Sequence, residues 1–188
     1  MVMGALLAAP LAARESDGMG ADELARFNAL PQAAARDQLL ACCTSAAWAD
    51  RMAAGRPYSS AKDAVRQSAA IVGMLTVADL ETALAGHPRI GERAAGSGQS
   101  AQWSRSEQSA AATADDATRG ELAAANLEYE RRFGHVYLVS ASGRSATDLL
   151  ALLRNRLANS PRAEWQAVRA ELQKINEIRL VKMLAGQR

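Results

Sequence analysis

The amino-acid sequence predicts an all-α, single-domain bundle of about seven to nine helices with no sheet. Alanine, the strongest helix former, accounts for 43 of the 188 residues, and runs of β-branched residues are scarce. Apolar residues recur at three- and four-residue spacing along most of the chain. Since 49% of the residues are hydrophobic but only 4% are aromatic, we expect a core built mainly from alanine and leucine. This length fits one domain.

The expected helical domain covers residues 19–188, and residues 1–18 are expected to form a disordered or loosely packed extension. The first 13 residues are apolar. A secretory signal has a Lys or Arg before its apolar stretch, and none is present here. The stretch is also too short to span a bilayer. A terminal apolar helix that packs onto a partner subunit is the alternative.

Helical spacing first appears at Asp22–Leu30, where Leu24, Phe27 and Leu30 share one side. Pro31 fits the first turn of a second helix, because a missing N–H costs little there. That helix is expected over residues 32–43, and the next one, over residues 45–52, holds Trp48. Gly55-Arg56-Pro57 is expected to be a break.

The pattern resumes at Ser60 and predicts a long helix to about Leu75. Thr76 and Asp79 have the spacing of a capping box for a helix over residues 77–84. Gly86 ends that helix. Pro88 follows immediately, and it biases His87 away from the α region at the helix end.

Residues 89–103 lack periodicity and contain three glycines, so the longest loop is expected there. A helix is then predicted to open at Ser104-Arg105-Ser106-Glu107, and a long one to run from Asp115 until Phe133-Gly134 ends it. The residues after Gly134, 135–140, are read as an extended connector. The last two helices are expected to run from about Gly143 to Ala158 and from Pro161 to about Leu184.

Charge and cysteine content weigh against several classes of protein. The net charge is only +2, and the arginines are spread along the chain, so a nucleic-acid binder is not expected. Cys42 and Cys43 are adjacent, and two adjacent cysteines rarely meet the geometry of a disulfide. With two histidines, no metal-binding spacing can be assembled. We therefore expect a reduced, cytoplasmic protein with neither a metal nor a membrane anchor.

His87 is the first candidate for chemistry, because an imidazole can give or take a proton near neutral pH. Its position alone is also that of a capping or surface histidine. Ser104 and Glu107 have two interpretations as well. A Ser-x-x-Glu capping box explains both residues, while the first turn of a helix could aim Glu107, Gln108 and free N–H groups at a small ligand.

Arg179 lies in Ile175-Asn176-Glu177-Ile178-Arg179-Leu180, close to the core side of the last predicted helix. An arginine at such a position usually extends to solvent or forms a salt bridge. As a functional group it could bind a carboxylate or a urea-like carbonyl with two parallel hydrogen bonds.

Several short motifs, in this order and spacing, resemble the 2-oxo-4-hydroxy-4-carboxy-5-ureidoimidazoline (OHCU) decarboxylase family. The resemblance covers roughly residues 24–184. Its motifs are Phe27-Asn28-x-Leu30, Trp48, Arg56-Pro57-Tyr58, His87-Pro88-Arg89-Ile90-Gly91, Ser104-x-x-Glu107-Gln108, Asn126-x-x-Tyr129-x-x-x-Phe133-Gly134, Gly143-Arg144-Ser145, Arg156-Leu157-x-Asn159 and Ile175-x-x-x-Arg179-Leu180.

The resemblance implies a small, all-α, usually dimeric enzyme that needs no cofactor and converts OHCU to (S)-allantoin in urate degradation. The catalytic histidine and glutamate of the family fall on His87 and Glu107. Pro88 lies beside the substrate in the family, and the backbone from Phe133 to Tyr137 closes the pocket. The family's other substrate-binding residues fall on Ser104, Gln108 and Arg179.

One position departs from the family pattern, because His135 stands where an aromatic residue is common after Phe133-Gly134. Two other functions stay open: a non-enzymatic helical module that binds or senses a ureide-like ligand, and a decarboxylase of a related carboxylated heterocycle.

Overall fold

The computed structural model describes residues 20, 22–92, 97–109 and 114–186. Within these residues the regular structure is helical and no strand occurs, which confirms the predicted all-α class. A first helix covers residues 22–29. The labelled helices that follow are α2 (Gln32–Cys42), α3 (Ala46–Ala54), α4 (Ala61–Met74), α5 (Val77–Leu84), α6 (Gln99–Glu107), α8 (Asp116–Phe133), α9 (Ala146–Arg156) and α10 (Pro161–Leu184). The expected extension, residues 1–18, lies outside the described residues.

Local signals set most helix starts. Ser60, Asp115 and Ser160 each accept a hydrogen bond from a main-chain N–H of the first turn that follows. The predicted capping box of Thr76 and Asp79 is confirmed, and the structure adds a second box at Ser145 and Asp148.

Gly134 ends α8 as predicted. Its φ of +78° is left-handed, and its N–H donates to the Glu130 carbonyl over 2.8 Å. The segment after it, residues 135–140, is extended and belongs to no sheet, as expected from the sequence.

One prediction is wrong. The helix expected to open at Ser104 is α6, which begins at Gln99, so Ser104 and Glu107 lie in its last turn and Gln108 follows as its C-terminal cap. No capping box forms between Ser104 and Glu107. The expected loop, residues 89–103, is correspondingly shorter. The Ser-x-x-Glu pattern misled because Gly98, which precedes the real first turn, supplies no side-chain cap.

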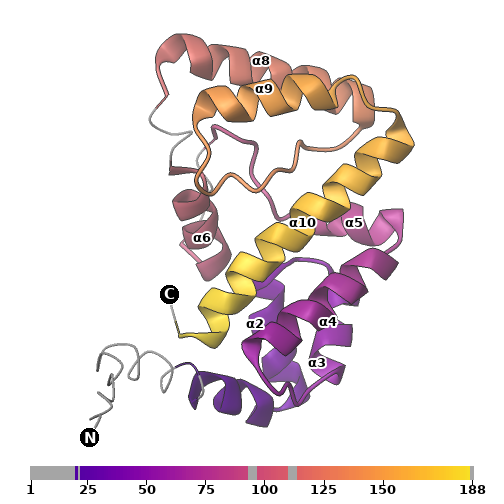
Figure 1. Ribbon diagram of the computed structural model, residues 1–188, viewed down its shortest axis with the longest axis vertical. Helices are drawn as coiled ribbons and strands as arrows, with labels where there is room; N and C mark the ends of the chain where they lie inside the picture. Colours follow the sequence, from indigo (N-terminus) through magenta and orange to yellow (C-terminus); the bar gives the residue numbers. More distant parts are fainter. Residues whose placement is uncertain (1–19, 21, 93–96, 110–113, 187–188) are drawn as a thin grey trace, which may run out of the picture.

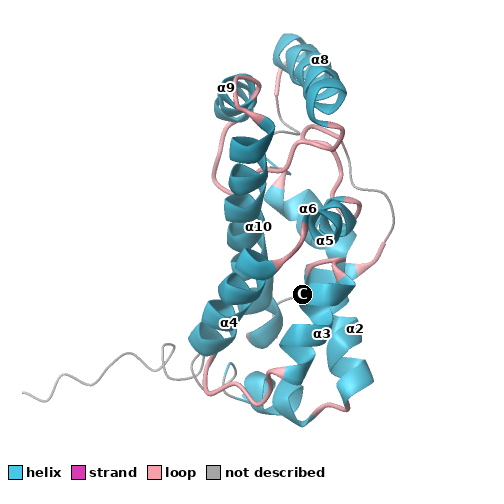
Figure 2. Cartoon of the chain, turned by 90° about the vertical axis from the view of Figure 1, so that its right-hand side faces the viewer, coloured by secondary structure: helices cyan, strands magenta, loops and turns pink. Residues whose placement is uncertain are grey.

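The helices pack around two hydrophobic clusters that α10 connects (Figure 1). The larger cluster joins α2, α3, α4 and α5 to α10 from Val168 to Leu184, and the smaller one joins α8, α9 and the 135–140 connector. The 24 residues of α10 span about 36 Å at 1.5 Å per residue. Figure 2 shows α4 beside the lower part of α10 and α8 and α9 at the opposite end.

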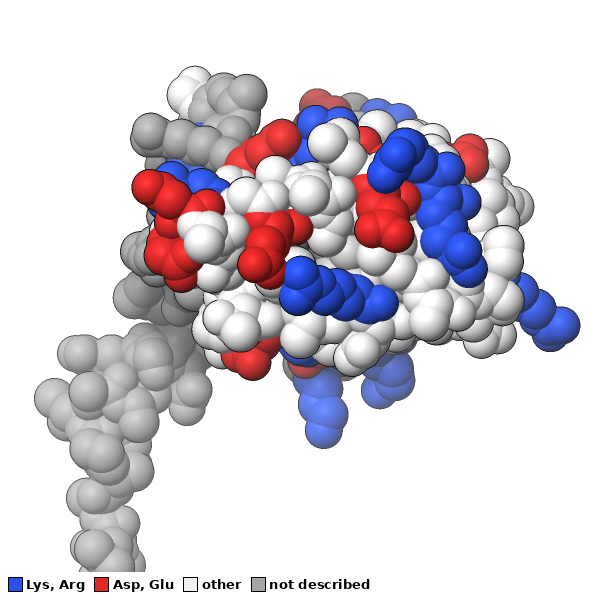
Figure 3. All heavy atoms as spheres, turned by 90° about the horizontal axis from the view of Figure 1, so that it is seen from above, with Lys and Arg blue, Asp and Glu red and all other residues white. Residues whose placement is uncertain are grey.

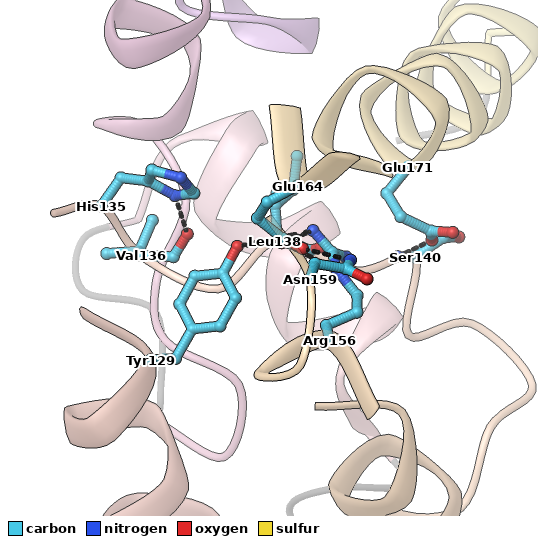
Figure 4. A network of polar contacts seen from close by, with 9 residues as sticks. All are labelled: Tyr129, His135, Val136, Leu138, Ser140, Arg156, Asn159, Glu164 and Glu171. Carbon is cyan, nitrogen blue, oxygen red and sulfur yellow. Dashed lines mark hydrogen bonds and ion pairs between the residues drawn. The ribbon is translucent and has the colours of Figure 1, made fainter. Parts of the chain in front are cut away.

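A buried polar network joins the smaller cluster to α10 (Figure 4). Glu164 is fully buried, and it accepts hydrogen bonds from Tyr129, from Asn159 (2.7 Å) and from Arg156 Nε (2.8 Å). Arg156 also donates to the Leu138 carbonyl over 2.7 Å. The network therefore fixes the connector between α8 and α9, and it explains why the sequence places polar side chains inside an apolar cluster.

Charged side chains of both signs are mixed on the face formed by the α8 and α9 end (Figure 3). Among the helices in the described ranges, none is both long and apolar enough to cross a membrane.

Replacing Glu164 by Ala should lower the free energy of unfolding by about 3–5 kcal/mol, since it leaves the Arg156 guanidinium buried without its anion. Glu121→Ala is the matched control: Glu121 forms an exposed ion pair with Arg154 and should cost less than about 1 kcal/mol. Urea unfolding of both variants measures the difference. Equal losses would show that the network contributes no more than a surface pair.

Candidate active site

The candidate site lies where the two hydrophobic clusters meet. Leu138 and Ile175 of the larger cluster and Tyr137 and Val139 of the smaller one form its apolar walls. The remaining lining residues include five of the predicted site residues: His87, Pro88, Ser104, Glu107 and Gln108. Segments far apart in the sequence thus converge on one pocket, as the motifs predicted.

The pocket is nearly closed, with a volume of about 20 Å³, which is room for about one water molecule. Gln108 bridges two of its walls, because its side-chain oxygen accepts a hydrogen bond from the main-chain N–H of Gly91 over 3.1 Å. A ligand larger than water therefore has to widen the pocket.

Arg179 stands behind the pocket and holds the end of α6. Its Nε and Nη2 donate to the two carboxylate oxygens of Glu107 over 2.9 and 2.8 Å. Nη2 also donates to Ser104 Oγ, and Nη1 to the Cys42 carbonyl, each over 3.1 Å. The arginine is 1% exposed. Arg179 forms the salt bridge that its position indicated, and it does not itself line the pocket, so its binding of substrate stays a prediction.

This arrangement changes the expected role of Glu107. From the sequence, Glu107 either caps a helix or faces a small ligand from the first turn of a helix. In the structure its carboxylate forms the bidentate ion pair with Arg179, and it borders the pocket beside Ser104.

His87 follows α5, and its N–H donates to the Leu84 carbonyl over 2.9 Å. Gly86, just before it, lies against Thr44: a Cβ at this position would come within 2.4 Å of the Thr44 methyl carbon. The partly buried imidazole forms no hydrogen bond with the described residues, so it is available to a ligand. Burial, together with the smaller effect of the positive charge of Arg179, lowers the pKa of His87 to about 3. His87 is therefore a neutral imidazole at pH 7.

Phe133 is the one predicted site residue that lies apart from both the pocket-lining residues and Arg179. It is the last residue of α8, and its ring packs on Tyr129 at 4.7 Å between centroids. The predicted closing segment contributes Tyr137 instead, followed by Leu138 and Val139. His135, which departs from the family pattern, packs against Trp165 with 4.4 Å between the ring centroids.

Sequence reasoning missed two groups at this site. The Cys42 carbonyl accepts a hydrogen bond from Arg179. Because this acceptor belongs to the main chain, no pattern of side chains in the sequence predicts it. Tyr137 lines the pocket, and its buried hydroxyl has no hydrogen-bond partner among the described residues. The resemblance implied only that the backbone up to Tyr137 closes the pocket, and it assigned no role to this side chain. Within the described ranges, no three His, Cys, Asp or Glu side chains gather as a metal site would require.

The fold and the site define a class of protein: an all-helical domain with a small pocket that combines a neutral imidazole, a carboxylate, an amide and a hydroxyl, as general acid–base chemistry needs. The family model described as OHCU decarboxylase matches residues 28–181. The chain belongs to the OHCU decarboxylase family.

Relatives of known name agree with this family. The chain is 32% identical to the uric acid degradation bifunctional protein TTL of Arabidopsis thaliana over 80% of its own length, but it spans only 48% of that protein. It is 31% identical to the 2-oxo-4-hydroxy-4-carboxy-5-ureidoimidazoline decarboxylase of Amia calva, over 67% of this chain and 73% of that one.

Two crystal structures have the same fold. One is an OHCU decarboxylase determined in the presence of (S)-allantoin, with a TM-score of 0.69 and 31% identity, over 79% of this chain and 97% of that one. The other, an (S)-allantoin synthase, has a TM-score of 0.65 over 85% of this chain and 53% of that one. Its 16% identity supports the likeness of fold alone.

Stability should fall with decreasing pH in part because of His87. Below about pH 6.5 the unfolded chain protonates this histidine, whereas the folded protein keeps it neutral until about pH 3. The protonation of His87 therefore has no effect on the free energy of unfolding above about pH 6.5. Below that pH it lowers this free energy progressively. His87→Gln should lose less unfolding free energy than the wild type between about pH 7 and about pH 5. Urea unfolding at both pH values measures this, and equal losses would contradict it.

Proposed function

We propose that the protein decarboxylates OHCU to (S)-allantoin in urate degradation. The observation that carries the proposal is the convergence of His87, Ser104, Glu107 and Gln108 on one small pocket in a chain of this family. The names of its relatives, which include a decarboxylase of this compound and a uric acid degradation protein, support the same reaction.

The reaction breaks the bond between the ring carbon and its carboxylate. The electron pair of that bond delocalises into the neighbouring C=N of the ring, and CO₂ leaves. The ring nitrogen, which then carries the negative charge, takes up a proton from solvent, and a second proton must reach the ring carbon from one face. The substrate hydroxyl loses its proton as it becomes the allantoin carbonyl. The site must therefore move protons and keep water from the intermediate.

His87 is the group we assign to the proton. A neutral imidazole can accept the hydroxyl proton, and it can then return a proton to the ring carbon. Pro88 holds it at the pocket wall. The small volume of the pocket leaves little room for water beside a substrate, which strengthens electrostatic interactions there.

Glu107 borders the pocket as a carboxylate whose position Arg179 fixes. Its negative charge near the substrate carboxylate would favour the loss of CO₂. Ser104 and Gln108 are the neutral donors expected to hold the ureido and ring carbonyl groups, and Gln108 becomes free to do so when its bond to Gly91 opens. Arg179 reaches the substrate only if Glu107 releases it. Such positioning can supply several kcal/mol of the barrier.

The finer parts of the proposal concern assembly and location. We propose a homodimer, on the resemblance to the family, and one helical domain over residues 19–188 with residues 1–18 as an extension. The two thiols support a reducing, cytoplasmic location: both cysteines are free, and burial raises the pKa of Cys42 to about 12.

The purified protein should speed the disappearance of freshly generated OHCU and yield optically active allantoin, with a chelator present. Ultraviolet absorbance follows the substrate, and circular dichroism follows the handedness of the product. A spontaneous rate together with racemic allantoin would contradict the decarboxylase proposal. Saturable binding of OHCU without turnover would identify a binding module instead.

His87→Ala should lower kcat by about 100-fold or more, because general acid–base catalysis contributes about 10²–10⁴-fold. Glu121→Gln is the control: Glu121 pairs with Arg154 at the surface and does not line the pocket, so this variant should turn over OHCU normally. Circular dichroism verifies that both variants are folded. Near wild-type turnover of His87→Ala would remove this residue from the mechanism.

A further inference from the structure

The segment from His87 to Gly91 has no regular secondary structure, although it carries the imidazole. Its start is tied to the end of α5 by the bond from the His87 N–H. Two side chains of α8, neither of which lines the pocket, bind the segment farther along. An irregular segment keeps a catalytic side chain in place only where other elements fix its backbone.

Asn126 provides the first contact. It is 2% exposed, and its Nδ2 donates to the Ile90 carbonyl over 3.0 Å. Because Ile90 is itself buried, loss of this donor would leave a main-chain carbonyl in apolar surroundings.

Glu130 provides the second contact, one helical turn after Asn126 and on the same face of α8. Its two carboxylate oxygens accept hydrogen bonds from Arg89 Nε (2.6 Å) and Nη2 (2.8 Å). These bonds lower the pKa of Glu130, so the pair is ionic at neutral pH.

The two contacts act on the residues directly after His87-Pro88. Pro88 fixes its own φ and restricts the backbone of His87, so holding Arg89 and Ile90 also holds His87. We propose that Asn126 and Glu130 are positioning residues that fix the His87 imidazole in the pocket from α8. This inference rests on the proposed function only in that His87 is the group assigned to the proton.

The test compares Glu130→Gln, Glu130→Arg and Asn126→Ala with Glu121→Gln. Glu121 is the matched control, because it lies on the same helix and pairs with Arg154 over 2.8 Å. We expect kcat to fall by about 10-fold in Glu130→Gln and by up to about 100-fold in Glu130→Arg, with smaller changes in KM. Glu121→Gln should keep wild-type kcat.

A second readout does not depend on turnover. The chain has two histidines, so the imidazole C–H resonances of His87 and His135 can be followed separately by NMR. We expect the His87 resonance to move or broaden in the Glu130 and Asn126 variants, while it stays unchanged in Glu121→Gln. The charge-swapped variant Arg89→Glu/Glu130→Arg should restore both the resonance and kcat relative to Glu130→Arg alone.

The positioning role is wrong if the His87 resonance of Glu130→Arg coincides with that of the wild type, or if its kcat equals that of Glu121→Gln. Should the wild-type protein fail to turn over OHCU, the proposed function fails, and the His87 resonance still decides the positioning role. The Glu130 variants keep the test valid if Asn126→Ala does not fold, since Glu130 is partly exposed.

Discussion

The site depends on the ion pair and the hydrogen bonds that the buried guanidinium of Arg179 forms. A charge with 1% exposure is tolerated only if ion pairs and hydrogen bonds replace its water. Glu107, Ser104 and the Cys42 carbonyl supply these bonds, and they come from α6 and the end of α2. The same contacts that make Arg179 tolerable therefore place a carboxylate and a hydroxyl at the pocket, so stability and site geometry share one cause.

The pocket is formed by long-range contacts because it lies between two clusters. One wall follows α5 and is held by Asn126 and Glu130 of α8. The opposite wall is the extended connector, which Arg156 holds through the Leu138 carbonyl within the Glu164 network. Each wall is irregular backbone fixed by polar side chains of rigid helices, an arrangement that can position a catalytic group and still allow the nearly closed pocket to widen.

The sequence predicted most of the fold because most helix ends depend on residues within one turn. Thr76 and Asp79 satisfy each other's main-chain donors, and Gly134 tolerates a left-handed φ, so both ends could be read locally. The start of α6 could not. Ser104 and Glu107 have the spacing of a cap, yet both bind Arg179, which lies 75 and 72 positions farther along the chain. No local pattern distinguishes the two outcomes.

The sequence by itself determined the helical class, the positions of most helices and, through the resemblance, which residues to consider at the site. These features follow from periodicity, capping and motif order, all of which are written along the chain. Only the tertiary structure decided that Arg179 lies behind the pocket instead of lining it, that Glu107 is its partner, that Phe133 lies apart, and that His87 is kept neutral. Those properties depend on burial and on the distances between charges, and both arise only when α6, α8 and α10 have packed together.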